Sequence, residues 1–163
     1  MRRKDKEVVS IENIIEIIKR CEVCRIAFFD KDYPYIIPLN FGYGYSYEND
    51  ELSLYFHGAS RGKKISLIEN NPKAGFEMDC SLNLVTGEIP CDFSMEYESV
   101  CGNGEIEILN GEEKIEGLKI IMNQYSQDKN YDFNKKGLNH FTVFKLKVNE
   151  VSGKKSNKPI NKE

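Results

Sequence analysis

The residues with the clearest chemical potential lie in one short segment between a predicted strand and a predicted helix. Arg61, Lys63 and Lys64 place three cations where the helix should begin, and Ser60 and Gly62 can offer main-chain N–H groups at the same point. A helix N-terminus favours negative charge and usually carries acidic side chains. Three basic residues in this position predict a bound anion, with a merely solvated basic surface as the alternative.

The same segment is not a nucleotide-triphosphate loop. Only three residues separate Gly58 from Gly62, whereas the P-loop has four between its glycines. His57 stands directly before it, on the side of its strand opposite Leu54 and Phe56. We therefore treat His57 as a candidate catalytic residue beside the anion site, and a hydrogen-bonded structural histidine is the alternative.

A second pattern, Cys21-Glu-Val-Cys24, has the spacing of zinc-binding and redox motifs. Zinc needs about four ligands, and no second close pair of Cys or His completes a set. A thioredoxin-like motif opens a helix after a strand, whereas this one closes a helix and opens a strand. We therefore predict no metal and interpret the two cysteines as small residues at a helix–strand corner.

Composition limits the class of protein. The 163 residues and 18.8 kDa suit one domain, and the net charge of −3 disfavours nucleic acid as a partner. We expect no membrane span, because no apolar run approaches about 20 residues. The basic opening from Met1 to Glu7 has no apolar segment behind it, so we expect no signal peptide. Together with five cysteines, an odd number, this predicts reduced thiols and a cytoplasmic location.

Hydrophobic periodicity predicts a mainly β chain with peripheral helices. Ser10 can cap the first helix, Pro38 belongs at a sheet edge or bulge, and Gly102 with Gly104 should mark a bulge. We predict helices at 11–20, 63–70 and 112–126, strands at 24–29, 33–45, 52–57, 74–78, 97–109 and 141–151, and a short helix and loop at 130–139. Short turns between neighbouring strands favour a six-stranded antiparallel barrel with helices outside. We expect one domain over 1–153 and a disordered basic tail over 154–163.

Several of these segments resemble a known family. They are Asp32-Tyr-Pro-Tyr-Ile-Ile-Pro-Leu-Asn-Phe-Gly-Tyr43, Leu54-Tyr-Phe-His-Gly-Ala59, Gly62-Lys-Lys64 through Asn71-Pro72, and Tyr97-Glu-Ser-Val-Cys-Gly-Asn-Gly104. They are similar to the flavin-binding split-barrel family related to pyridoxamine 5'-phosphate oxidase, specifically its nitroimidazole-resistance (Nim-type) branch. The resemblance extends from residue 1 to about residue 155.

The resemblance implies a six-stranded split β-barrel that works as a homodimer, with one FMN per chain in a groove at the dimer interface. It implies that the flavin ring lies against Ile37, Pro38, Leu39 and Asn40, and that His57, Gly58 and Ala59 lie near the ring and ribityl chain. Lys63 and Lys64 match the basic pair that binds the FMN phosphate in the wider superfamily. Ser99, Val100 and Cys101 would meet the flavin of the partner copy. The family's phosphate thus coincides with the anion site that residues 60–64 predict on their own.

The chain also departs from its wider superfamily. The Arg-containing C-terminal motif of true pyridoxamine phosphate oxidases is missing, since the chain closes with Val151-Ser-Gly-Lys-Lys155, which argues against pyridoxal synthesis. The sequence-based hypothesis is therefore an FMN-dependent reductase of a 5-nitroimidazole, another nitroaromatic or a different small-molecule electron acceptor, with NAD(P)H as a candidate donor. The alternative is a non-catalytic carrier or sensor that binds flavin or haem.

Overall fold

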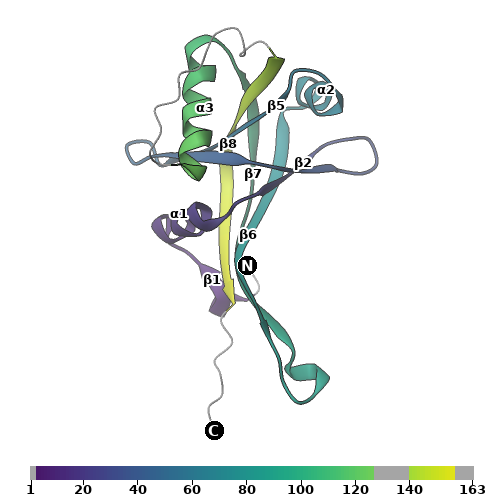
Figure 1. Ribbon diagram of the computed structural model, residues 1–163, viewed down its shortest axis with the longest axis vertical. Helices are drawn as coiled ribbons and strands as arrows, with labels where there is room; N and C mark the ends of the chain where they lie inside the picture. The colour runs from purple at the N-terminus through teal and green to yellow at the C-terminus, as the bar shows by residue number, and fades with distance from the viewer. Residues whose placement is uncertain (1–2, 127–139, 157–163) are drawn as a thin grey trace.

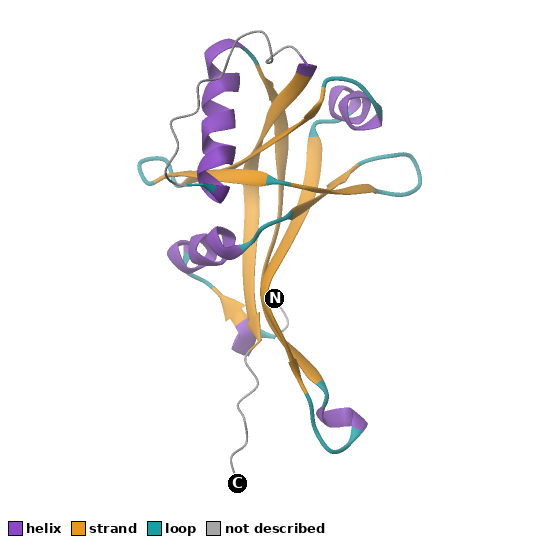
Figure 2. Cartoon of the chain, viewed as in Figure 1, coloured by secondary structure: helices purple, strands orange, loops and turns teal. Residues whose placement is uncertain are grey.

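The computed structural model describes residues 3–126 and 140–156, and within these ranges it contains eight strands and three α-helices (Figures 1 and 2). The strands are β1 (Glu7–Val8), β2 (Cys24–Phe28), β3 (Tyr35–Leu39), β4 (Phe41–Ser46), β5 (Glu51–Ala59), β6 (Lys73–Val85), β7 (Ser94–Leu109) and β8 (Phe141–Ser156). The helices are α1 (Ile11–Arg20), α2 (Lys63–Asn70) and α3 (Gly111–Tyr125). None of the described helices is long and apolar enough to cross a membrane.

The strands form one antiparallel sheet in the order β3-β2-β6-β7-β8-β5-β4, and β1 pairs with the far end of β8. β3 and β4 lie at opposite ends of this order, yet Asn40 alone separates them in sequence. One residue spans only a few ångströms, so the sheet must curl until its two edges approach each other at Asn40. No β3–β4 pairing occurs in the described part of the chain, so closure into a complete barrel is not shown.

The main core fills the concave side of the curled sheet. Strand residues that point inward alternate with outward ones, and Leu54, Phe56 and Phe144 are fully buried. The rings of Phe56 and Phe144 stack with centroids 5.3 Å apart. α1 and α2 add isoleucines to the same cluster, which fixes both helices against the sheet: Ile14, Ile17 and Ile18 from α1, Ile65 and Ile68 from α2. The Ser10 hydroxyl accepts a hydrogen bond from the Asn13 N–H, which confirms the predicted cap.

A second, smaller core lies under α3 on the convex side. Leu118 and Ile121 of α3 pack there with Leu109 and Val143. α3 approaches β4 so closely that a Cβ at Gly42 would lie 2.5 Å from the Ile120 carbonyl oxygen. Glycine is therefore required at position 42 for this helix to lie on the sheet.

Three sequence-based predictions need correction. The expected strand at 33–45 is two strands, because the chain leaves one sheet edge at Leu39 and joins the other at Phe41, a change of partner that continuous β-favouring residues conceal. The prediction of six strands becomes eight for this reason and because Glu7–Val8 also pairs. The strands expected at 74–78 and 97–109 are longer, because β6 continues to Val85 and β7 begins at Ser94, with a short 3-10 helix between them.

The tail prediction is also wrong at its start. β8 continues to Ser156, because Lys154 pairs with Ser99 on one side and with Glu7 on the other. Long-range partners of this kind stabilise a polar segment that reads as loose in sequence. The bulge expected within β7 lies on its neighbour instead: Asn103 pairs with Glu150 and Gly104 with Val148, so the extra residue is Asn149 of β8. The short helix expected at 130–139 and residues 157–163 lie outside the described residues.

Candidate flavin-phosphate site

The candidate site is built where β5 ends and α2 begins. β5 pairs with β8 through His57, Gly58 and Ala59, and three exposed residues then lead into the helix. Gly62 is the N-cap with φ of 116°, a backbone conformation that strongly favours glycine. No side chain caps the helix, and its first turn holds no acidic residue. The helix start therefore presents N–H groups and a positive dipole end to solvent.

Lys64 is the unusual member of the site. Its side chain is half-buried and turns back over β5, so that a Cβ placed on Gly58 would lie 2.0 Å from the Lys64 Nζ. The ammonium lies 5.4 Å from the centre of the Phe144 ring. Within the described residues it has no carboxylate partner or hydrogen bond. Burial lowers the pKa of Lys64, as expected for a cation without a compensating anion.

Lys63 points elsewhere, although it is the next residue. Its Nζ lies 2.5 Å from the Asp30 carboxylate and 4.8 Å from the centre of the Tyr35 ring. Asp30 follows β2 and Tyr35 opens β3, so this contact ties α2 to the far edge of the sheet. The two lysines of the sequence motif are thus separated in space, with one cation neutralised and the other available.

His57 lies on the opposite face of β5 from the Lys64 ammonium, because the neighbouring Gly58 faces Lys64 and His57 pairs with Val143. Its ring makes an edge contact with Phe141, with centroids 6.3 Å apart. The expected orientation is confirmed, because Leu54 and Phe56 are buried while His57 is exposed in the single chain. The protein packed around the imidazole, and secondly the Lys64 ammonium, lower its pKa below the ordinary value. Both effects favour the neutral imidazole.

The remaining predicted residues lie on the opposite half of the sheet. One row of paired residues crosses four strands. Pro38 of β3 pairs with Arg25 of β2, and Arg25 also pairs with Glu77 of β6. Glu77 in turn pairs with Cys101 of β7. We call the side of β3, β2, β6 and β7 that carries these residues the outward face. Arg25 bonds to Glu77 at 3.0 Å. Pro38 lies on an edge strand, as predicted.

The structure distinguishes among the predicted flavin contacts. Ser99 lies on the outward face with Cys101, whereas Val100 is fully buried and faces the main core. Ile37 and Leu39 pack against the main core, so their side chains are turned inward, while Pro38 and Asn40 are exposed. Any ligand on this face would meet Val100, Ile37 and Leu39 only through their main chain.

Sequence reasoning missed Asp30 and Phe144 as neighbours of the two lysines. Asp30 was assigned only to a turn, and Phe144 only to a core strand. The spacing of a strand pattern shows which side a residue faces but not which distant helix approaches it. Both contacts depend on the curl of the sheet, which brings α2 against β2 and β8.

The CxxC cysteines belong to the main core. Cys21 and Cys24 are buried, and burial raises the pKa of both thiols. A raised pKa disfavours the thiolate that redox chemistry and metal binding require. Among the described residues, no group of three or more His, Cys, Asp or Glu is placed to hold a metal ion.

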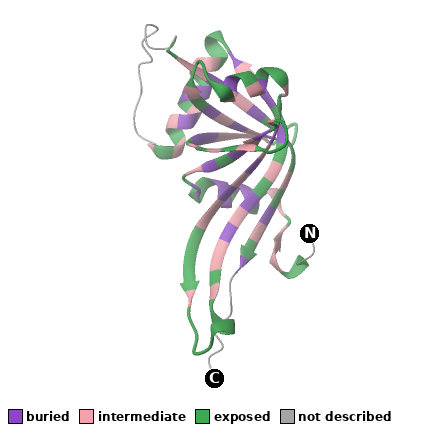
Figure 3. Ribbon diagram, turned by 90° about the vertical axis from the view of Figure 1, so that its right-hand side faces the viewer, coloured by how far each residue is buried: buried purple, intermediate pink, exposed green. Residues whose placement is uncertain are grey.

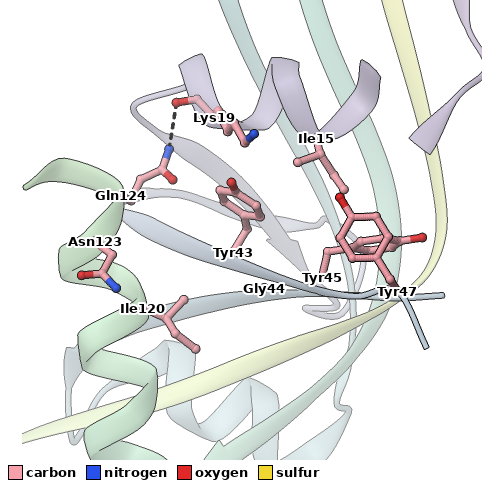
Figure 4. Close-up of a pocket in the computed structure, with 9 residues that line it drawn as sticks. All are labelled: Ile15, Lys19, Tyr43, Gly44, Tyr45, Tyr47, Ile120, Asn123 and Gln124. Atoms are coloured by element: carbon pink, nitrogen blue, oxygen red, sulfur yellow. Dashed lines mark hydrogen bonds between the residues drawn. The ribbon is translucent and has the colours of Figure 1, made fainter. Parts of the chain in front are cut away.

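A pocket of about 480 Å³ lies between α1, β4 and α3 (Figure 4). Its walls include Tyr43, Tyr45 and Tyr47, with Lys19 and Gln124 at one end. The Gln124 amide donates to carbonyls at the end of α1, including that of Cys21 at 3.1 Å, so this residue joins two helices. None of the predicted site residues lines this pocket.

Known proteins of similar sequence and structure show the family of this chain. The family model for pyridoxamine 5'-phosphate oxidase matches residues 10–155. The chain belongs to this family. The solved structure of a putative 5-nitroimidazole antibiotic resistance protein from Bacteroides thetaiotaomicron is 28% identical to this chain. The TM-score is 0.77, and the match covers 91% of this chain and 85% of that one.

Two further solved structures share the fold of the family at lower identity. The flavocytochrome Anf3 from Azotobacter vinelandii is 18% identical, with a TM-score of 0.79 over 98% of this chain and 73% of that one. The FAD and heme binding protein from Mycobacterium smegmatis is 16% identical, with a TM-score of 0.80 over 94% of this chain and 74% of that one. No functionally curated protein matches the chain in sequence.

Proposed function

We propose that this chain is an FMN-binding reductase that works as a homodimer in the cytoplasm, with each flavin between two copies. The half-buried Lys64 ammonium carries this proposal. It lies beside the uncapped start of α2, and burial already lowers its pKa. An anion at this point would restore the charged state of Lys64 and cap the helix dipole together.

The residues around Lys64 fit a phosphate group. Gly58 leaves the space that the Lys64 side chain occupies, and Ser60 and Gly62 follow at the exposed turn. Arg61 adds a second cation beside the helix start. Phosphate binding at a helix N-terminus combines main-chain N–H groups with nearby cations in the same way. Lys63 contributes less in this proposal, because Asp30 already neutralises it.

The flavin ring would extend toward the outward face. β3 is an edge strand, so main-chain groups of Ile37–Asn40 on its open side remain available to the polar edge of the ring. Cys101 is exposed and Ser99 is half-buried on the same face of β7, and both would approach from the partner copy. In this arrangement the flavin contacts β3 of one copy and β7 of the other, so both groups of predicted residues reach it only in a dimer.

FMN would supply the electron transfer, while the protein binds it and tunes its surroundings. His57 is the residue before Gly58, and its lowered pKa favours the neutral imidazole, in which one nitrogen can accept a proton and the other can donate one. We therefore assign His57 the role of proton carrier to an acceptor. The similarity to the Bacteroides resistance protein makes a 5-nitroimidazole the first acceptor to test.

The test begins with the purified protein and its absorbance spectrum. We expect one FMN per chain after reconstitution. Lys64→Met should weaken FMN binding about tenfold or more, because a charged hydrogen bond contributes about 1.5–3 kcal/mol. Lys63→Met is the matched control and should weaken binding several-fold less. A protein that takes up no FMN, or equal effects of the two variants, would contradict the proposal.

Turnover is tested on the FMN-loaded protein with NAD(P)H and a 5-nitroimidazole. We expect oxidation of the donor that depends on the acceptor, and a lower rate for His57→Ala with FMN still bound. Bound flavin that no donor and acceptor can cycle would instead favour the carrier function. A haem absorbance band in place of the flavin spectrum would favour the haem-binding alternative.

A further inference from the structure

The longest strands of the sheet continue beyond the body of the molecule as a two-stranded ribbon. Past Cys80 and Glu98, β6 and β7 run out together and end in a short 3-10 helix, Pro90–Asp92 (Figure 1). We call residues 81–97 the arm. In Figure 3 most of this ribbon is exposed, in contrast to the buried strands above it. An isolated two-stranded hairpin is only marginally stable in water.

One side of the arm is apolar and uncovered. Leu84 pairs directly with Met95, Leu82 lies two residues away on the same side, and Phe93 directly precedes β7. Leu84 and Met95 are 59% and 43% exposed, and Leu82 and Phe93 are also exposed. The other side is polar, where the Asn83 amide donates to the Glu96 carboxylate at 2.9 Å. This alternation is the pattern of a strand pair with one face packed against a surface.

A β-bulge gives the arm this polarity. Cys80 pairs with Glu98 but Asn83 pairs with Glu96, so β6 carries one extra residue here. Ser81, at the bulge, has φ of 58°, which is uncommon for a residue other than glycine. The extra residue moves Leu84 to the side occupied by Met95. On β7 that side also carries Cys101, so the apolar side of the arm continues the outward face.

We propose that the apolar side of the arm packs on the outward face of a second copy, near the start of that copy's α2. The inference rests on the proposed function only for the existence of a second copy. Seven residues beyond Cys80 extend about 20 Å, and four strands of a sheet span about 15–20 Å. The arm is therefore long enough to cross the bare strands β7, β6, β2 and β3 of a partner.

Charge favours this orientation. The arm contains Glu88, Asp92 and Glu96 and no Lys or Arg. The arm and the start of α2 lie at opposite ends of the molecule in Figure 1, and the latter carries Arg61, Lys63 and Lys64, of which Lys63 is paired with Asp30. A two-fold axis that lies between the outward faces and perpendicular to the long axis of the molecule would bring the opposite ends of two copies together. Each acidic arm then meets the basic end of its partner, and the arrangement closes with two equivalent contacts.

The first test is the mass in solution of Leu84→Asp combined with Met95→Asp. We expect twice the chain mass of 18.8 kDa for the unaltered protein and 18.8 kDa for the variant, by light scattering after size exclusion. Both side chains are exposed in the single chain, so the far-UV circular dichroism of the variant should not change. Val9→Asp is the matched control, because Val9 is 83% exposed and lies outside the arm. A variant of doubled mass, or an unaltered protein of 18.8 kDa, would overturn the proposal.

The second test locates the arm with Cys91, an exposed thiol at its tip. A cysteine-to-lysine cross-linker is applied to a mixture of ¹⁴N- and ¹⁵N-labelled protein. We expect mixed-isotope peptides that join Cys91 to Lys31 or Lys63, and their loss in Cys91→Ser. A dimer without these links would show that the arm packs elsewhere.

The two proposals fail in different ways. Lys64→Met should lose FMN and still give the doubled mass and the Cys91 cross-links. If no flavin binds but the combined Leu84→Asp, Met95→Asp variant has the single-chain mass, the arm contact stands without the proposed function. If that variant binds flavin and keeps the doubled mass, only the arm contact is wrong.

Discussion

The convex surface of the sheet has two halves, one covered by a helix and one bare. Over β4, β5 and the start of β8, α3 covers the strands and forms the small core with Ile121 and Val143. Over β3, β2, β6 and β7, no described helix lies on the outward face, and Ile36 is 58% exposed there. The covered half is complete within one chain. The bare half carries the predicted flavin contacts and continues into the arm, and it is the half on which we propose that a second copy packs.

The charged contacts of the sheet are also of two kinds, partly exposed on the bare half and buried on the concave side. On the bare half, Arg25 bonds to Glu77 and Asp79 in partly exposed positions. On the concave side of the same strands, the Glu98 carboxylate is buried and bonds to Arg20 and to Lys155. We therefore expect substitutions in the covered or buried positions to lower the free energy of unfolding more than substitutions on the bare half.

The largest expected effect comes from removing a side chain of the covered half. Ile121→Ala should lower the free energy of unfolding by about 2–5 kcal/mol, the usual cost of a large-to-small change in a core. Ile36→Ala on the bare half should cost about 0.5 kcal/mol or less in a single chain. Urea denaturation of both variants in the monomeric Leu84→Asp, Met95→Asp background measures the contrast.

The same pair of variants sharpens the comparison when the arm is intact. If a second copy covers Ile36, the cost of Ile36→Ala should grow with protein concentration, because binding stabilises the folded state by mass action. The cost of Ile121→Ala should not depend on concentration. Equal costs for both variants in the monomeric background would contradict the division between the two halves.

The helices and most strands were predictable because their patterns are local. Isoleucines at helical spacing and the Ser10 cap identify α1, and alternation around Leu54 identifies β5. The break at Asn40 was not predictable, because it reflects a change of pairing partner between residues that all favour β structure. The arm was missed for a similar reason: its apolar residues alternate only after a bulge that no glycine marks.

The arrangement of the candidate site was only partly predictable. Three cations at the start of a helix predict an anion site from residue types alone, and the bound anion stays a prediction. Sequence treats Lys63 and Lys64 as an equivalent pair, and only the curled sheet shows that Asp30 takes one of them. Likewise, Ser99, Val100 and Cys101 form one motif in sequence, yet the pleat sends Val100 into the core.

An intermediate effect is expected from the buried carboxylate. Glu98→Gln removes the charge from hydrogen bonds with Arg20 and Lys155 and should cost about 1–3 kcal/mol. Glu77→Gln removes an exposed partner of Arg25 and should cost about 1 kcal/mol or less. Denaturation at pH 7 in matched buffers compares them. A Glu77→Gln variant that is less stable than Glu98→Gln would break the distinction between the two sides.

The charge of Glu98 also predicts how the stability of the protein changes as the pH falls. Burial tends to raise the pKa of Glu98, but the bonds from Lys155 and Arg20 outweigh it and the net shift is downward. A carboxyl with a lowered pKa in the folded state contributes stability above its unfolded pKa, which is about 4.5, and loses it as the pH falls. The stability of the unaltered protein should therefore decline below about pH 4.5 more steeply than that of Glu98→Gln. Parallel curves would show that Glu98 carries no net benefit from its charge.

The smallest effect is a change in the titration of His57, which reports on the unfinished site without disturbing the fold. In the free protein its midpoint should lie below the ordinary 6.5, because burial and the Lys64 ammonium both oppose protonation. Inorganic phosphate bound at the start of α2 would offset the Lys64 charge and raise that midpoint. NMR titration of the His57 imidazole, with and without phosphate, measures the difference.

Two lysine variants show whether that response comes from Lys64. Lys64→Met removes the nearby cation, so the His57 midpoint should rise in the free protein and respond little to phosphate. Lys63→Met should leave both values unchanged, because the Lys63 ammonium is bound to Asp30 on the far side of the helix start. A His57 midpoint that follows Lys63 rather than Lys64 would place the free cation, and with it the anion site, on the side of α2 that faces β2.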